Sequence, residues 1–85
     1  MDDRLRDAFY QAYVGEAKAA LRVKVYARKA EEENLPQVAR LFRAIAASEE
    51  VHGERALRKL KEIKNTEENL AASFESETRV AEVAY

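Results

Sequence analysis

The hydrophobic and polar positions of the chain follow the period of an α-helix over three stretches. The first runs from about Asp3 to Glu33, the second from about Pro36 to Lys64, and the third begins after Thr66. In the first stretch the apolar and small residues recur at spacings of three and four: Leu5, Ala8, Phe9, Ala12, Ala19, Ala20, Val23, Ala27 and Ala30. Residues at such spacings lie on one face of a helix, so the pattern predicts three amphipathic helices.

Two short breaks separate these helices. At the first break, Asn34 suits the left-handed backbone conformation that often ends a helix, and Pro36 suits the first turn of the next helix. This combination predicts a tight turn and an antiparallel hairpin. At the second break, we expect Thr66 to cap the third helix. Because no glycine or proline occurs between Leu60 and Tyr85, one long helix in place of the second and third is the alternative.

Polar residues interrupt each hydrophobic stripe. Glu16 occupies the position between Ala12 and Ala19 in the first. The second stripe reads Val38, Leu41, Phe42, Ile45, Glu49, His52, Ala56, Leu60 and Ile63, and the third reads Leu70, Phe74, Glu77, Ala81 and Ala84. Carboxylates and an imidazole are therefore predicted on faces that pack against other helices. Outside the stripe, Glu54 and Arg58 have the i, i+4 spacing of a surface ion pair.

The interrupting residues fall at one level of the predicted hairpin. Counted from its turn, Glu16 lies about 18 residues along the first helix, and Glu49 and His52 lie about 14 and 17 residues along the second. At about 1.5 Å per residue, the three lie within roughly 6 Å of one level. Glu77 lies about 12 residues into the third helix, so it reaches the same level if that helix folds back or packs on another chain.

A cation is the expected partner of these carboxylates. Burying two carboxylates together costs on the order of several kcal/mol each, and no Lys or Arg lies in either stripe near that level. Glu49 and His52 form a Glu-x-x-His motif, whose oxygen and nitrogen donors suit iron or manganese, with zinc a weaker fit. Because a lone motif of this kind often arises by chance on a surface, the prediction depends on its place in the stripe and on the level of Glu16.

Composition restricts the class of protein. The 85 residues form a single domain, 1–85, small enough to need oligomerisation or a bound metal for stability. The absence of cysteine excludes disulfides and thiolate-bound zinc. The 15 basic and 16 acidic residues are interspersed, which argues against nucleic-acid binding. No apolar run is long enough to cross a membrane and no signal-peptide pattern occurs, so we expect a cytoplasmic protein.

One chain carries only half of a dimetal site. Ferritin-like dimetal carboxylate sites combine one Glu from each of two helices with Glu-x-x-His from each of two others. Two copies of this chain would supply Glu16, Glu49 and His52 twice, and their carboxylates would balance two divalent irons. We therefore expect an all-α fold: a ferritin-like helical hairpin plus a third helix, completing a four-helix bundle by homodimerisation or helix swapping.

The sequence resembles the rubrerythrin family over nearly its whole length. The resemblance lies in VGEAKAALRVKVYARKAEEENLPQVARLFRAIAASEEVHGERAL and in NTEENLAASFESE. It implies iron ligands at Glu16, Glu49 and His52, with Glu77 as a further ligand from the third helix. It covers the N-terminal half of the family pattern, so the chain is either a naturally short self-assembling version or a fragment.

The chain departs from the family pattern in its third helix and in its cysteines. Ser76 replaces the glycine that precedes the glutamate, and Val80 stands where rubrerythrins often carry an additional glutamate that moves with the redox state of the iron. The resemblance therefore does not extend to the redox-linked movement of that glutamate. The sequence contains no cysteine, so we expect no rubredoxin-like domain of the kind found in full rubrerythrins, and we expect a separate electron donor protein.

The resemblance implies reduction of hydrogen peroxide, a defence against oxidative stress, at two iron ions per site. Iron oxidation by dioxygen, a ferroxidase activity, is the second interpretation, because it uses the same ligands. A metal-free helical assembly module, or an inactive fragment, is the third. Metal content together with oligomeric mass distinguishes the third interpretation from the first two.

Overall fold

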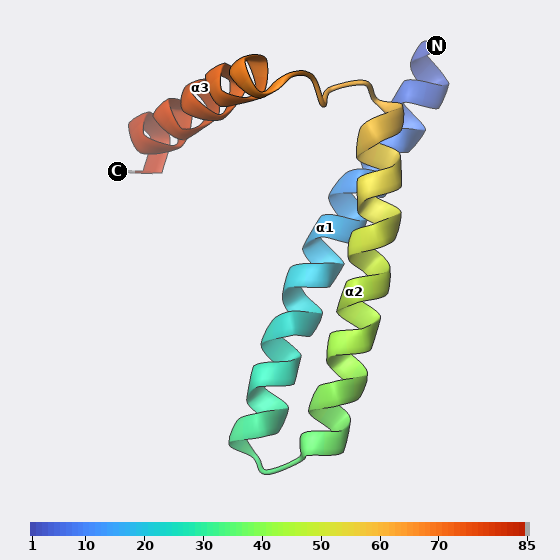
Figure 1. Ribbon diagram of the computed structural model, residues 1–85, viewed down its shortest axis with the longest axis vertical. Helices are drawn as coiled ribbons and strands as arrows, with labels where there is room; N and C mark the ends of the chain where they lie inside the picture. Colours follow the sequence, from blue (N-terminus) through green and yellow to red (C-terminus); the bar gives the residue numbers. More distant parts are fainter. Residues whose placement is uncertain (85) are drawn as a thin grey trace.

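The computed structural model describes residues 1–84, and these form an all-α structure. Helix α1 spans Asp3–Glu32, α2 spans Pro36–Lys59 and α3 spans Thr66–Ala84. Helices α1 and α2 form an antiparallel hairpin, and α3 extends away from its open end (Figure 1). The three predicted helices are confirmed, although α2 ends at Lys59, before the expected Lys64.

The turn of the hairpin has the predicted chemistry. Asn34 adopts the left-handed conformation with φ of 61°, and Pro36 is the first residue of α2. The backbone N–H of Leu35 donates to the carbonyl of Ala30 at 2.8 Å, which satisfies a carbonyl at the end of α1. At the other end of α1, Asp2 caps the helix by accepting a hydrogen bond from the N–H of Leu5 at 2.9 Å.

The break between α2 and α3 corrects one expectation. The backbone reverses at Lys61, with φ of 58°, so α2 and α3 are separate helices. Asn65, not Thr66, caps α3: its Oδ1 accepts a hydrogen bond from the N–H of Glu68 at 2.8 Å. Asparagine is as good a cap as threonine or better, and Thr66 is consequently the first helical residue.

The two helices of the hairpin meet along a line of small residues, which we call the seam. Its buried members are Ala20, Val23, Ala27 and Ala30 of α1 and Ala39, Ala46, Gly53 and Ala56 of α2. Small side chains let the two backbones approach closely, and larger side chains lie to either side. This corrects the stripe expected for the second helix, because Val38, Leu41 and Ile45 lie outside the seam and are exposed.

The two sides of α2 differ in polarity. One side, the open face, carries Val38, Leu41, Ile45 and His52, whose spacings of three, four and seven place them on one side of the helix. Leu41 is 58% exposed and Val38 is 40% exposed. Within residues 1–84, no helix covers this apolar surface.

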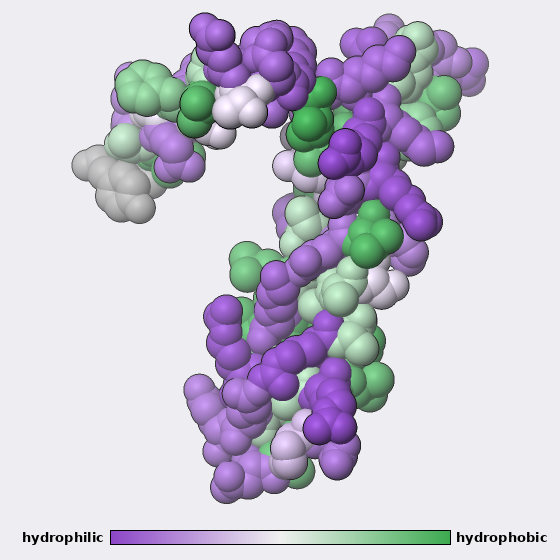
Figure 2. Space-filling view, viewed as in Figure 1, coloured by the Kyte–Doolittle hydropathy of each residue, from purple (hydrophilic) through white to green (hydrophobic). Residues whose placement is uncertain are grey.

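The opposite side, the polar flank, carries Arg40, Arg43, Glu50, Glu54 and Arg58. Ion pairs cross it from α1 to α2, between Lys24 and Glu50 and between Arg43 and Glu31. The predicted pair of Glu54 and Arg58 is confirmed, at 3.0 Å. Hydrophilic side chains accordingly cover much of this face of the hairpin (Figure 2).

Helix α3 packs against neither α1 nor α2 within residues 1–84. Its apolar side chains are exposed: Leu70 by 65%, Phe74 by 77% and Val83 by 89%. None of the three helices described is long and apolar enough to cross a membrane. The position of the candidate site is therefore determined by the α1–α2 hairpin.

Candidate metal centre

Glu49 lies near the middle of α2, in line with the seam. Its side chain is half-buried, and Oε2 is fully buried with no hydrogen-bond partner among residues 1–84. A buried polar atom without a partner costs about 1–3 kcal/mol, and more when the group is charged. The position therefore calls for a positive or hydrogen-bonding partner that residues 1–84 do not supply.

Glu16 faces the same part of the seam from α1. It is half-buried and packs on Gly53, where an added Cβ would lie 3.3 Å from the Cβ of Glu16. Gly53 follows Glu49 by one helical turn, so the two glutamates belong to neighbouring levels of the hairpin. The absence of a side chain at Gly53 allows Glu16 to lie this close to α2.

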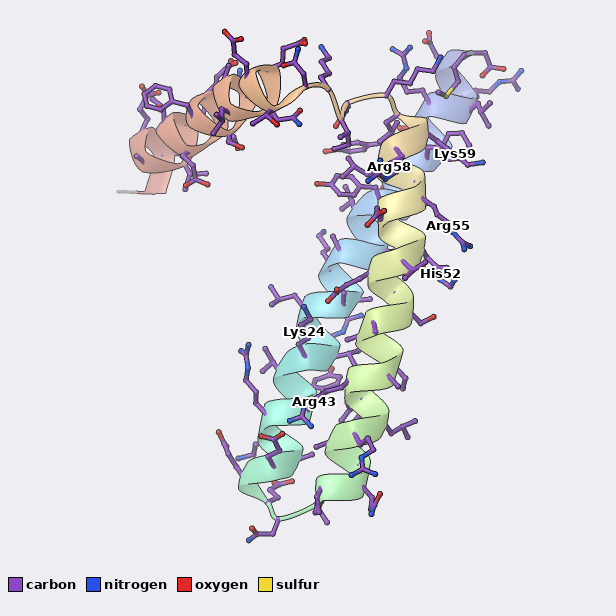
Figure 3. All side chains as sticks on the ribbon, in the orientation of Figure 1. Lys24, Arg43, His52, Arg55, Arg58 and Lys59 are labelled. Atoms are coloured by element: carbon purple, nitrogen blue, oxygen red, sulfur yellow. The ribbon has the colours of Figure 1, made fainter. Side chains whose placement is uncertain are left out.

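His52 is exposed and belongs to the open face. It projects from α2 at an edge that does not contact α1 (Figure 3). The imidazole is thus directed toward the side on which Val38, Leu41 and Ile45 are also uncovered. Any ligand held by both Glu49 and His52 has to lie along this edge of the hairpin.

The remaining candidate, Glu77, lies apart from these residues. It is exposed on α3, which does not contact the hairpin. Within residues 1–84, no three carboxylate or imidazole groups are close enough to hold one metal ion. The hairpin places Glu16 beside Gly53, one helical turn from Glu49, and places His52 at the edge of the seam, whereas Glu77 lies on a helix that does not contact the hairpin.

The residues present fit a divalent metal. The ion pairs formed by residues 1–84 include neither Glu16 nor Glu49, so no basic side chain neutralises the seam at this level. The buried Oε2 of Glu49 lacks a partner, and a nitrogen donor lies one turn further along the same helix, at His52. Carboxylate and imidazole donors together suit iron or manganese.

Sequence reasoning missed one residue that shapes this site, Gly53. It recurs at intervals of seven with Ala39 and Ala46, all three buried, and this spacing of small residues was a signal for the seam. Val38 and Ile45 are also seven residues apart and directly precede Ala39 and Ala46. Because their side chains are larger and more hydrophobic, the hydrophobic pattern favours them for the contact in place of the small residues. A line of the smallest residues indicates the closest approach of two helices better than a line of the most hydrophobic ones.

An antiparallel hairpin whose seam carries Glu16 and Glu49, neither of them in an ion pair within residues 1–84, defines an all-α protein. Comparison with known proteins agrees with this class. A family model described as rubrerythrin matches residues 7–84. Rubrerythrin-2 of Clostridium acetobutylicum is 41% identical over 56 residues, which is 66% of this chain and 30% of that relative. No solved structure matches. The chain belongs to the rubrerythrin family and aligns with under a third of this relative's length.

Proposed function

We propose that two copies of the chain assemble a di-iron site that reduces hydrogen peroxide. In this assembly the open faces of two hairpins pack together into a four-helix bundle. Glu16, Glu49 and His52 of each copy hold the two iron ions between them. The observation that carries the proposal is the buried Oε2 of Glu49, which has no hydrogen-bond partner among residues 1–84.

The second copy supplies what one hairpin lacks. The open face leaves Leu41 and Ile45 in contact with water, and the buried residues of the seam are mostly alanine. Covering these exposed side chains with an identical face removes apolar surface from water, which stabilises by about 25 cal/mol per Å². A two-fold axis also duplicates His52 and both glutamates, which supplies the ligand set of a dimetal carboxylate site.

The residues of the chain perform separate tasks in this site. Glu16 and Glu49 of both copies together would provide the negative charge that offsets two divalent cations, and each His52 would provide a neutral nitrogen donor. A bound iron pair would supply two electrons, with which hydrogen peroxide and two protons become two water molecules. The apolar residues of the paired open faces, Val38 and Ile45 among them, exclude bulk water from the reaction.

Glu77 is proposed as an additional ligand that depends on the position of α3. Because α3 does not contact its own hairpin, Glu77 reaches a metal only when α3 packs beside a hairpin in the assembled protein. The exposed Leu70 and Phe74 favour such packing. Comparing the iron affinity of Glu77→Gln with that of the wild type tests this contribution: loss of affinity supports it, and unchanged affinity opposes it.

The test combines metal content, oligomeric mass and reaction rate. We expect protein loaded anaerobically with ferrous iron to contain one iron per chain and to sediment as a dimer. Mixed in a stopped-flow instrument, the ferrous dimer should react far faster with hydrogen peroxide than with dioxygen. A faster reaction with dioxygen would indicate a ferroxidase. A chain that binds no iron would indicate a metal-free helical module, and an iron-loaded monomer would refute the shared site.

A further inference from the structure

A pocket lies between α1 and α2 on the polar flank. Its volume is about 160 Å³, several times the roughly 30 Å³ that a water molecule occupies in the liquid. Glu49 lines it. Small or apolar residues form much of the rest: Tyr13, Ala17, Ala20, Gly53 and Leu57. We call this the Glu49 pocket, because the half-buried ligand candidate Glu49 forms part of its lining.

The Glu49 pocket opens on the opposite side of the hairpin from the open face. Glu50 and Glu54 also line it, and each is two residues from His52 in the sequence. Two residues correspond to a rotation of about 200° around a helix, so His52 points almost directly away from this opening. A second hairpin that covers the open face therefore leaves the pocket uncovered.

We propose that the Glu49 pocket is the route by which hydrogen peroxide reaches the iron pair. This inference depends on the proposed function, because it assumes a partner hairpin over the open face. A neutral molecule suits a wall formed by Tyr13, Ala17 and Leu57. The carboxylates at the mouth are already paired, Glu50 with Lys24 and Glu54 with Arg58.

The size of the pocket also predicts selectivity. Gly53 has no side chain and Ala17 and Ala20 have the smallest ones, which leaves the pocket open although Tyr13 and Leu57 also line it. It admits a molecule of the size of hydrogen peroxide and hinders a branched organic hydroperoxide. We expect the wild type to react at least about tenfold more slowly with tert-butyl hydroperoxide than with hydrogen peroxide, and Leu57→Ala to narrow that difference.

Ala17→Leu is the variant that tests the route. Ala17 is exposed, so the larger side chain narrows the pocket without removing a buried contact of the seam. The matched control is Ala47→Leu, which makes the same change at an exposed position of α2. Ala47 lines a different groove, between Lys24 and Arg43, that does not include Glu49.

The experiment uses the full chain loaded with ferrous iron. With iron content and dimer mass unchanged, Ala17→Leu should lower the second-order rate constant for hydrogen peroxide about tenfold, while Ala47→Leu stays within about twofold of the wild type. Ala17→Leu should also slow the binding of nitric oxide to the iron. Nitric oxide is a small neutral probe that needs access to the metal but undergoes no peroxide chemistry. If Ala17→Leu does not fold, Leu57→Ala gives the opposite test, a faster reaction with tert-butyl hydroperoxide.

The outcomes separate the route from the proposed function. An active wild type with an equally active Ala17→Leu dimer overturns the route and leaves the function standing. A loss of peroxide rate with unchanged nitric oxide binding also overturns it, because the effect then lies in the chemistry and not in access. An iron-loaded wild type that does not reduce peroxide overturns the function and the route with it.

Discussion

Replacement of Glu49 by glutamine should stabilise the metal-free chain and reduce the stability that the chain gains when it binds metal. Glutamine keeps the size of the side chain and removes the charge. In the metal-free chain, Oε2 of Glu49 is buried with no hydrogen-bond partner among residues 1–84. A buried unpaired group costs about 1–3 kcal/mol and more when it is charged, and glutamine removes only the part that the charge adds. Because the residue as a whole is only half-buried, we take the low end and expect the variant to gain about 1 kcal/mol. For a domain of this size, that gain raises Tm by about 4–8 °C.

Ferrous iron should reverse the order of stability of the wild type and Glu49→Gln. A ligand that binds only the folded state at about 100 times its Kd adds about 2.7 kcal/mol to the free energy of unfolding. The wild type should receive this gain, whereas Glu49→Gln, which lacks one charged ligand, should receive much less. The variant is thus the more stable protein in EDTA and the less stable one with iron.

The assay is thermal unfolding followed by far-UV circular dichroism, at one chain concentration, in EDTA and in anaerobic ferrous iron. Glu54→Gln is the control, because Glu54 is exposed and paired with Arg58. It should lose only about 0.2–1 kcal/mol and respond to iron like the wild type. The reasoning is refuted if Glu49→Gln is less stable than the wild type in EDTA, or if iron stabilises both equally.

Two further pairs of substitutions test the seam and the open face. In urea denaturation, Gly15→Ala should stabilise the metal-free chain by about 0.5–1 kcal/mol, since nothing lies within 4 Å of the added Cβ. Gly53→Ala should gain less stability and should weaken iron binding, because its Cβ would lie 3.3 Å from the Cβ of Glu16. Equal gains at both glycines would contradict this packing. Ile45→Glu should convert an iron-loaded dimer into a monomer in analytical ultracentrifugation, while Val51→Glu, exposed elsewhere on α2, should leave the mass unchanged. A dimeric Ile45→Glu protein would rule out the open face as the interface.

Local signals predicted the helices and the turn of the hairpin. The positive φ of Asn34 and the place of Pro36 follow from the conformations those residues prefer, and the pair of Glu54 and Arg58 follows from helical spacing. The cap at Asn65 differed by one residue from the expectation, because asparagine and threonine can both cap a helix and neighbouring residues compete for the role.

The spacing of the apolar residues on α2 does not determine which of them contact α1 and which lie on the open face. Val38, Ile45 and His52 follow the same spacing as Ala39, Ala46 and Gly53, one position apart, so both sets fit one broad apolar face. Which set meets α1 depends on how closely the two backbones approach, and that is a property of both helices together. The position of α3 is likewise a tertiary feature, since its own sequence specifies a helix but no contact with the hairpin.

The shared metal site is tested most directly by the anomalous difference map of a crystal grown with iron-loaded protein. We expect two iron peaks between two hairpins related by a two-fold axis, each within coordination distance of Glu16, Glu49 and His52. Iron bound elsewhere, or Glu49 surrounded only by solvent in crystals that contain iron, would contradict the proposed site.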